Sequence, residues 1–309
     1  MTHAFTIRPS GPFSLKAAEG FGAGFESGIG AHATGPGVVM AFPVESWTSS
    51  AGAEVWQDAD GVIHGELSAS ADPIDPSDLA TAQAQVARSL SLDHDGAGWA
   101  AVGERDPIIG RLQARYDFLR PVCFYSAYEA ATSFVIGQRI AMRQARAVKR
   151  RLADAWGDAV DVGGLTLHAF PRPRPLMEVD AVQGLSAVKM QRIRGLAEAA
   201  LDGRLDSARL RALAPEEALA ELRTLPGVGP WTAQGILFRG CGVVDALPDA
   251  DEISRDAVKW AYELPDTPDD ATWARISDGW RPYRMWATVL LHVAWRRDQP
   301  TTPSYRQSR

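Results

Sequence analysis

The feature that most constrains the fold of this 309-residue chain is a pair of glycines in the segment LPGVGPWTA at 225–233. Gly227 and Gly229 flank a single apolar residue, Val228, and this pattern permits a very tight turn with positive φ angles. Helical patterns precede and follow the segment. The second helix is predicted to begin with Pro230, because a missing N–H costs nothing in the first turn of a helix. The sequence therefore predicts two helices joined by a hairpin, with Val228 pointing inward.

Such a hairpin suits an anion. The backbone N–H groups at the start of the second helix, together with the positive end of the helix dipole, form a site that fits a DNA phosphate. The alternative is an ordinary pair of helices joined by a glycine turn, which is a common arrangement. The residues predicted to make the DNA-backbone contact are Leu225, Gly227, Val228, Gly229 and Thr232.

Helical patterns dominate the chain from about residue 118 onward. Apolar residues recur there at helical spacing, between short breaks rich in proline and glycine. The predicted helices are 125–138, 142–156, 186–201, 215–225, 229–240, 252–262 and 284–297. We expect an all-α core over 116–300, followed by a disordered tail at 301–309.

The first 115 residues have a different pattern. Short β-type runs bounded by Gly, Asp and Pro predict strands of an antiparallel sheet at 37–42, 52–57 and 61–70. A helix is predicted over 75–92, where apolar residues again follow helical spacing. The fold class is therefore α+β, with an N-terminal antiparallel sheet domain with helices at 1–115.

Charge and composition restrict the partners only partly. The net charge is −6, from 32 Lys and Arg against 38 Asp and Glu, which by itself disfavours DNA. Binding depends on where the charges lie, however. Six Arg or Lys fall within 139–151, whereas many acidic residues fall within 54–95 and 263–278. This asymmetry is compatible with one basic, DNA-facing side.

Other features point to the cell interior. No window approaches about 18 uninterrupted apolar residues, so no membrane span is predicted. The first twenty residues have no apolar run typical of a signal peptide, which favours the cytoplasm. Cys123 and Cys241 lie far apart and in no CxxC pair, so neither a zinc site nor an iron–sulfur cluster is expected. We expect both to be small buried residues.

Four segments in this order resemble the helix-hairpin-helix DNA glycosylase superfamily, and within it the bacterial DNA-3-methyladenine glycosylase II (AlkA-like) family. They are Ile136-Gly137-Gln138, the hairpin at 225–233, Asp245 to Asp251 (DALPDAD) and RPYRMWATVLL at 281–291. The resemblance covers roughly 120–297. It implies a bacterial enzyme of base excision repair that acts on double-stranded DNA with damaged bases, as a monomer near the nucleoid and without a required cofactor.

The resemblance assigns the catalytic carboxylate to Asp251, twenty residues after Trp231. A carboxylate near C1′ can stabilise an oxocarbenium-like transition state and help position or deprotonate water. Asp249 and Asp245 are rivals, and a plain helix cap is the structural alternative for Asp251. Bifunctional members have a nucleophilic lysine where this chain has Trp231, so no β-lyase step is expected.

The resemblance also implies a pocket for an extruded base and a side chain that fills the vacated space. The predicted pocket residues are Trp231, Trp286, Tyr283 and His292, with core packing as the alternative for most of the aromatic ones. The predicted wedge is Gln138 with Arg139, and a solvated or phosphate-binding face is the alternative there. Backbone carbonyls of Arg223, Leu225 and Val228 are implied ligands of a monovalent cation.

The implied substrates are alkylated purines of the 3-methyladenine and 7-methylguanine type, since an electron-poor base stacks well on aromatic rings. Two alternatives remain open in the sequence. One is a glycosylase for another damaged base, although the relatives that act on oxidised guanine carry the lysine. The other is a non-catalytic DNA-binding or scaffold protein, which needs neither Asp251 nor an aromatic pocket.

Overall fold

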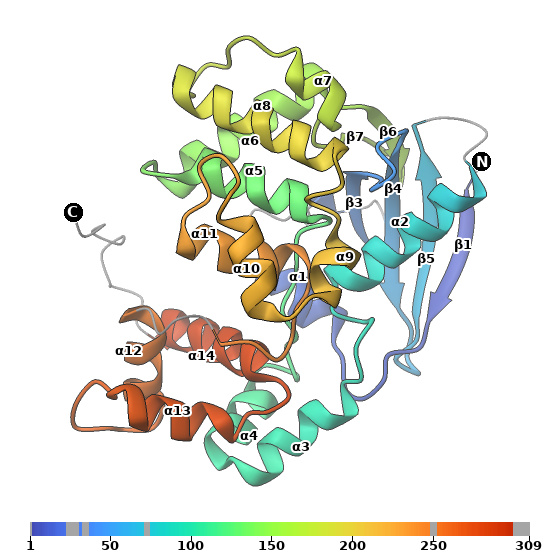
Figure 1. Ribbon diagram of the computed structural model, residues 1–309. Coiled ribbons are helices and arrows are strands. Elements are labelled where there is room, and N and C mark those ends of the chain that lie inside the picture. The colour runs from blue at the N-terminus through green and yellow to red at the C-terminus, as the bar shows by residue number, and fades with distance from the viewer. Residues whose placement is uncertain (1, 23–30, 33–36, 71–74, 248–251, 299–309) are drawn as a thin grey trace.

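The computed structural model describes residues 2–22, 31–32, 37–70, 75–247 and 252–298. A five-stranded antiparallel sheet with the order β1-β5-β4-β3-β2 forms one side of the molecule (Figure 1). Its strands are β1 (His3–Ile7), β2 (Ala31–His32), β3 (Val38–Pro43), β4 (Ser50–Gln57) and β5 (Ile63–Ala69). The three predicted strands are confirmed as β3, β4 and β5.

Local chemistry explains the hairpin between β4 and β5. Asp58 accepts hydrogen bonds from the backbone N–H groups of Asp60 and Val62, both at 2.9 Å. Gly61 has a φ of +79°, which glycine adopts without a steric penalty. The tight turn sets the register, with Val55 opposite Gly65. The buried side chains of Val55, Ile63 and Leu67 belong to the main hydrophobic core.

The helices follow in a nearly continuous series. In the first half they are α1 (Leu15–Gly22), α2 (Pro76–Ser89), α3 (Ala97–Arg105) and α4 (Pro107–Arg115). The second half contains α5 (Ala127–Gly137), α6 (Met142–Trp156), α7 (Pro173–Met177), α8 (Ala187–Leu201), α9 (Ser207–Ala212), α10 (Pro215–Leu222), α11 (Pro230–Gly235), α12 (Glu252–Ala261), α13 (Asp270–Asp278) and α14 (Arg284–Asp298). A π-helical turn, Ile236–Gly240, extends α11. None of the described helices is long and apolar enough to cross a membrane.

Helix starts coincide with capping residues. The side chains of Asp75, Ser126 and Ser186 accept backbone N–H groups at the starts of α2, α5 and α8. Such caps satisfy N–H groups that have no partner within the helix. α10 and α11 instead begin with proline, Pro215 and Pro230. These signals explain the starts of α5, α8, α10 and α11. The seven helices predicted after residue 118 are found close to their predicted bounds, whereas α7, α9 and α13 were not predicted.

One part of the helical half is not helical, so the prediction of an all-α core needs a correction. β6 (Ala159–Val162) and β7 (Leu165–His168) form an antiparallel hairpin. Gly163 and Gly164 both have positive φ angles, as a two-residue turn between strands requires. Val162 packs against Val39 on the outer face of the large sheet. Residues 159–168 alternate apolar and polar side chains, which is the pattern of a strand pair rather than of a helix.

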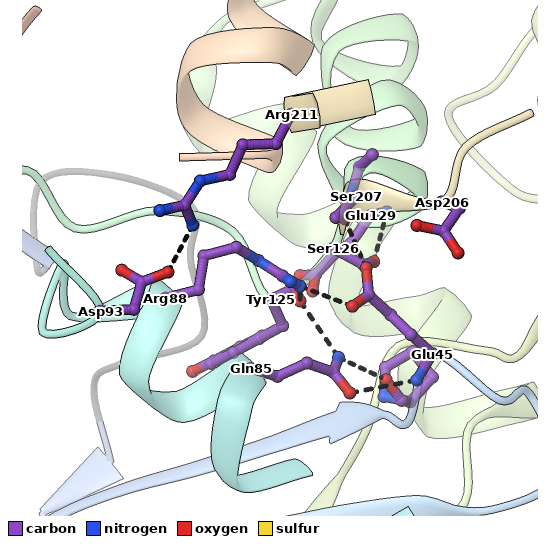
Figure 2. Close-up of polar contacts among 12 residues, drawn as sticks. Glu45, Gln85, Arg88, Asp93, Tyr125, Ser126, Glu129, Asp206, Ser207 and Arg211 are labelled. Atoms are coloured by element: carbon purple, nitrogen blue, oxygen red, sulfur yellow. Dashed lines mark hydrogen bonds and ion pairs between the residues drawn. The ribbon is translucent and has the colours of Figure 1, made fainter. Parts of the chain in front are cut away.

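A buried polar network joins the sheet to the helical half (Figure 2). Glu45, which follows β3, accepts a hydrogen bond from Arg88 on α2 at 2.7 Å and another from Ser207 at the start of α9. Arg88 also donates to the carbonyl of Tyr125 at 2.7 Å. The guanidinium of Arg88 thus neutralises the Glu45 carboxylate. The other carboxylate oxygen accepts from Ser207, which belongs to the helical half of the chain.

The two halves also meet at their aromatic residues. Trp99 of α3 packs against Tyr283 and Trp286, with ring centroids 6.0 and 5.9 Å apart. α4 packs on α14, and Arg105 donates to the carbonyl of Gly279 at 3.0 Å. Figure 1 shows α3 and α4 lying beside α13 and α14. The boundary between residues 115 and 116 stays a prediction, and the predicted tail at 301–309 lies outside the described residues.

Candidate active site

The predicted glycine hairpin is present, but of its two glycines only Gly227 has a positive φ angle, whereas Gly229 is extended. α10 ends at Leu222 and α11 begins at Pro230. Between them, the backbone N–H of Val228 donates to the carbonyl of Leu225 at 3.2 Å, and Gly227 has a φ of +79°. Leu225, Val228 and Thr232 are buried and fix the two helices together, whereas Gly229 is exposed with no heavy atom near its vacant Cβ position. The hairpin therefore presents bare backbone to solvent.

The α5–α6 turn lies directly against this hairpin. Gln138 Nε2 donates to the carbonyl of Gly227 at 2.9 Å. Arg139, the next residue, is exposed and has a φ of +57°. Residues 89 positions apart in the sequence are thereby brought together, and both predicted wedge residues lie beside the predicted DNA-backbone contact.

Two basic residues of α8 contact the α5–α6 turn, and neither was predicted from the sequence. Lys189 Nζ contacts the carbonyls of Ile136 and Gln138 at 2.8 and 2.5 Å. Arg192 Nη1 donates to Gln138 Oε1 at 3.3 Å. Partial burial, and then the charge of Arg192, lower the pKa of Lys189. The available signal was the three-residue spacing of Lys189 and Arg192, which puts both on one helix face.

Trp231 is the one predicted pocket aromatic that lies open on the surface, with 62% of it exposed. It contacts the half-buried ring of Phe134 edge-on, with centroids 5.2 Å apart and planes at 87°. Gly235 leaves room for Phe134, because a Cβ there would lie 2.5 Å from the ring. Phe134 was not predicted, and it adds a second aromatic surface beside the hairpin.

Tyr283 and Trp286 have a different position. They are 6% and 2% exposed, their rings pack together at 5.1 Å, and both also contact Trp99. The Arg120 guanidinium lies over the Trp286 ring at 5.3 Å, and Tyr283 donates to the carbonyl of Asp95. Neither ring can stack on an extruded base while it is buried in this way. Their placement favours the alternative considered for them, core packing.

His292 lies half-buried on α14. Its Nε2 is 3.0 Å from Ser254 Oγ on α12, the helix that begins at Glu252. The contact fixes the start of α12 against α14. His292 therefore contacts the helix that follows DALPDAD, and its role in a base pocket stays a prediction.

The cysteines follow the prediction. Cys123 and Cys241 are both free and buried, and burial raises the pKa of each thiol. Within the part of the chain that the structure describes, no group of three or more His, Cys, Asp or Glu could hold a metal ion.

Comparison with known proteins places this geometry in context. No family model matches the chain. A relative from Mycobacterium tuberculosis, named "Probable bifunctional transcriptional activator/DNA repair enzyme AlkA", is 34% identical over 69% of this chain and 42% of its own length. DNA-3-methyladenine glycosylase 2 of Escherichia coli is 30% identical over 62% of this chain and 66% of its own length. The chain belongs to the AlkA-like helix-hairpin-helix DNA glycosylases.

The fold agrees with this membership. The solved structure of a 3-methyladenine DNA glycosylase from Archaeoglobus fulgidus aligns over 97% of this chain and all of its own, with a TM-score of 0.74 and 18% identity. The likeness thus includes the N-terminal sheet, which lies outside the range of about 120–297 over which the sequence resembles the family. The alignments with the first curated relatives span 59%, 69% and 42% of those relatives' own lengths.

For an AlkA-like glycosylase, the key carboxylate is expected at Asp251, and both Asp251 and its rival Asp249 lie outside the described residues. The third aspartate, Asp245, accepts from Arg284 Nε at 2.6 Å and from Arg281 Nη1 at 3.0 Å. Two guanidinium groups neutralise this carboxylate and join the loop to the start of α14. This placement favours a structural role for Asp245.

The predicted cation site of this AlkA-like chain falls in the hairpin. Arg223 follows α10 directly, and the carbonyl of Leu225 accepts the Val228 N–H, so the turn folds back on itself here. Carbonyl oxygens can replace the hydration shell of an alkali cation, so the donor chemistry of Arg223, Leu225 and Val228 fits such an ion. The cation site remains a prediction.

Proposed function

We propose that the protein is a monofunctional DNA glycosylase that hydrolyses the N-glycosidic bond of alkylated purines in duplex DNA. The observation that carries this proposal is the joining of the bare glycine hairpin to the exposed Arg139 turn, with the open Trp231 ring beside them. These are the parts needed to bind a DNA backbone, enter the duplex and stack on an extruded base. The names of the relatives support the substrate class.

The proposed roles follow from position. Leu225 and Val228 donate their N–H groups within the turn, so the backbone N–H groups of Gly227 and Gly229 are the ones proposed to bind one phosphate. A monovalent cation on the nearby carbonyls would supply positive charge beside that phosphate. Arg139 enters the duplex, where its planar guanidinium can stack on bases and hydrogen-bond the orphaned partner. Trp231 stacks on the electron-poor alkylated purine.

The proposed reaction is a hydrolysis. The C1′–N bond breaks, its electron pair leaves with the base, and water forms the new bond to C1′, losing a proton. Asp251 stabilises the positive charge that develops on the sugar and helps to position or deprotonate that water. Because Trp231 occupies the place of the lysine, no Schiff base forms and the strand remains intact at the abasic site.

The proposed setting is the bacterial cytoplasm, with the enzyme acting as a monomer on nucleoid DNA. Basic side chains gather where contact is proposed: Arg139 and Arg143 are exposed, and Lys189 and Arg192 contact the turn at Gln138. Locally concentrated positive charge attracts the phosphate backbone despite the net charge of −6.

The test is base release from duplexes that each carry one lesion, with 3-methyladenine, 7-methylguanine and hypoxanthine in the panel. Wild-type protein is expected to release alkylated purines, and Asp251→Asn to lower the single-turnover rate at least about 100-fold, as removal of key electrostatic stabilisation does. Asp249→Asn is the matched control and is expected to keep most of the rate. Duplex affinity should survive both changes.

Two results would overturn the proposal. One is the absence of base release by wild-type protein from every duplex in the panel, which would leave a role in DNA binding. The other is borohydride trapping of a covalent protein–DNA adduct, since that requires an amine nucleophile. Release by Asp251→Asn at the wild-type rate would instead assign the catalytic role to a different carboxylate. Strand breaks are expected only after alkali or heat.

A further inference from the structure

The α5–α6 turn has a backbone that must be held in place. Arg139 has a φ of +57°, in the left-handed region that non-glycine residues rarely occupy. Such a residue persists only when its surroundings determine its conformation. Its own side chain is exposed, so the constraint must come from neighbouring residues.

The constraint comes from α8. Lys189 Nζ contacts the carbonyls of Ile136 and Gln138, the last turn of α5 and the residue before Arg139. These contacts satisfy carbonyls that the end of a helix leaves without intrahelical partners. Lys189 therefore holds the backbone on the N-terminal side of Arg139. It adds to the backbone hydrogen bonds from the Gln138 N–H to the Val135 carbonyl at 3.4 Å and from the Ile140 N–H to the Gly137 carbonyl at 3.3 Å.

Gln138 is fixed through both ends of its side-chain amide. Its Nε2 donates to the Gly227 carbonyl at 2.9 Å and its Oε1 accepts from Arg192 at 3.3 Å. Entry of Gln138 into a duplex would break both contacts. Arg139 has no such cost, because its side chain is already in solvent.

Arg192 touches the hairpin as well as the turn. A Cβ at Gly227 would lie 2.7 Å from Arg192 Cδ, so the aliphatic part of the arginine covers this glycine. Among the described residues, the ion pairs found include no carboxylate partner for Lys189 or Arg192. Arg192 thus connects the two loops through packing and a hydrogen bond rather than through an ion pair.

We propose that Lys189 and Arg192 are positioning residues that lock the Gln138–Arg139 turn onto the glycine hairpin. Gln138 connects the α5–α6 turn to the glycine hairpin through its side-chain amide, and Arg139 is the one residue of the turn that enters the duplex. The glycine hairpin and the Gln138–Arg139 turn then form one rigid unit. Binding of the DNA backbone by the hairpin therefore places Arg139 at the base step that opens. This inference rests on the proposed function, because it assigns how that site engages duplex DNA.

The test compares Arg192→Met with Arg194→Met. Arg194 lies on the same helix, but its partner is the fully exposed Asp180 at 3.8 Å, so the control removes an equal charge without touching the turn. The first readout is amide hydrogen exchange of the protein without DNA. We expect exchange of the hydrogen-bonded amides of Ile140 and Val228 to rise about tenfold in Arg192→Met and in Lys189→Met, the effect of one lost hydrogen bond to a charged group. Arg194→Met should exchange like wild type.

The second readout is fluorescence of 2-aminopurine next to an abasic-site analogue in a duplex, which reports unstacking without any base release. At saturating protein, Arg192→Met and Lys189→Met should give less than about half of the wild-type increase, whereas Arg194→Met should give all of it. Arg139→Ala should lose the increase, and Gln138→Ala should behave like Arg192→Met rather than like Arg139→Ala.

The two readouts separate the possible failures. Unchanged exchange in both α8 variants refutes the lock, whether or not the protein is a glycosylase. Faster exchange with a full fluorescence increase refutes its role in opening the duplex. If wild-type protein neither binds nor unstacks the duplex, the proposed function fails, and the exchange data alone then decide whether the lock exists.

Discussion

The two glycines of the hairpin are expected to respond in opposite ways to the same substitution. Gly227 has a φ of +79°, and a Cβ there would lie 2.7 Å from Arg192 Cδ. Gly229 has a φ of −90° and a ψ of −179°, and its Cβ position has no neighbour within 4 Å. Only Gly227 is therefore required by the protein itself.

The magnitudes follow from these values. A left-handed alanine costs about 1–2 kcal/mol, so Gly227→Ala should lower the free energy of unfolding by at least that much. Displacement of Arg192 from Gln138 adds about 1 kcal/mol for the lost hydrogen bond. Gly229→Ala should instead raise the free energy of unfolding by about 0.4–1 kcal/mol, because alanine restricts the unfolded chain.

DNA affinity should separate the glycines again. The methyl group of Gly229→Ala would project into the space through which a phosphate approaches the backbone. We therefore expect this variant to be stable and yet to bind duplex DNA at least about tenfold more weakly, a loss of about 1.4 kcal/mol. Urea unfolding and fluorescence anisotropy with a labelled duplex measure the two quantities. Equal loss of stability in both variants, or wild-type affinity in Gly229→Ala, would refute the assignment of the hairpin.

Two further predictions concern a tryptophan pair and a histidine. Trp231→Ala should lower base release at least about tenfold with little change in the free energy of unfolding, because this side chain is 62% exposed. Trp286 is 2% exposed, so Trp286→Ala should lower the free energy of unfolding by about 3–5 kcal/mol. Similar losses of stability in both variants would contradict this distinction. Burial, opposed by Asp93, lowers the pKa of His94 below its usual 6.5, and its Nε2 lies 2.9 Å from the Gly242 carbonyl. As the pH falls through 6.5, His94 is therefore protonated in the unfolded chain while it is still neutral in the folded chain. The free energy of unfolding should then fall by up to about 1.4 kcal/mol per pH unit until the pKa of His94 in the folded chain is reached. Urea midpoints at pH 7.5 and 5.5 should converge in His94→Gln, and an equal acid loss in that variant would show that another group is responsible.

The sequence predicted the helical half well because its signals are local. Periodic apolar residues, capping serines and first-turn prolines act within a few positions, and α5, α6 and α8 are found almost where these signals place them. The glycine hairpin was predictable for the same reason, since Gly227 needs its positive φ whatever surrounds it. The β6–β7 hairpin also had a local signal, two glycines between alternating residues, but it lies among helices and was not predicted.

The partners within the site could not be predicted in the same way. Nothing in the sequence near Gln138 indicates that its amide will contact Gly227 and Arg192, because those contacts depend on how α5, α8 and α10 pack. Likewise, Trp231 and Trp286 are both tryptophans in segments that resemble the family, yet one is open and the other is buried. Burial is a property of the whole fold, so motif position alone does not separate a ligand-facing ring from a core ring.

The network around Glu45 has a consequence for how the chain can be divided. Glu45 and Arg88 come from the N-terminal half, and Ser207 and the Tyr125 carbonyl come from the helical half. A fragment that starts after α4 would keep Ser207 without its acceptor and would uncover the Trp286 ring. Trimming the chain to its helical half should therefore yield a poorly folded product that aggregates. Chimaeras that exchange the sheet between related enzymes would need to carry residues 45, 88 and 207 together.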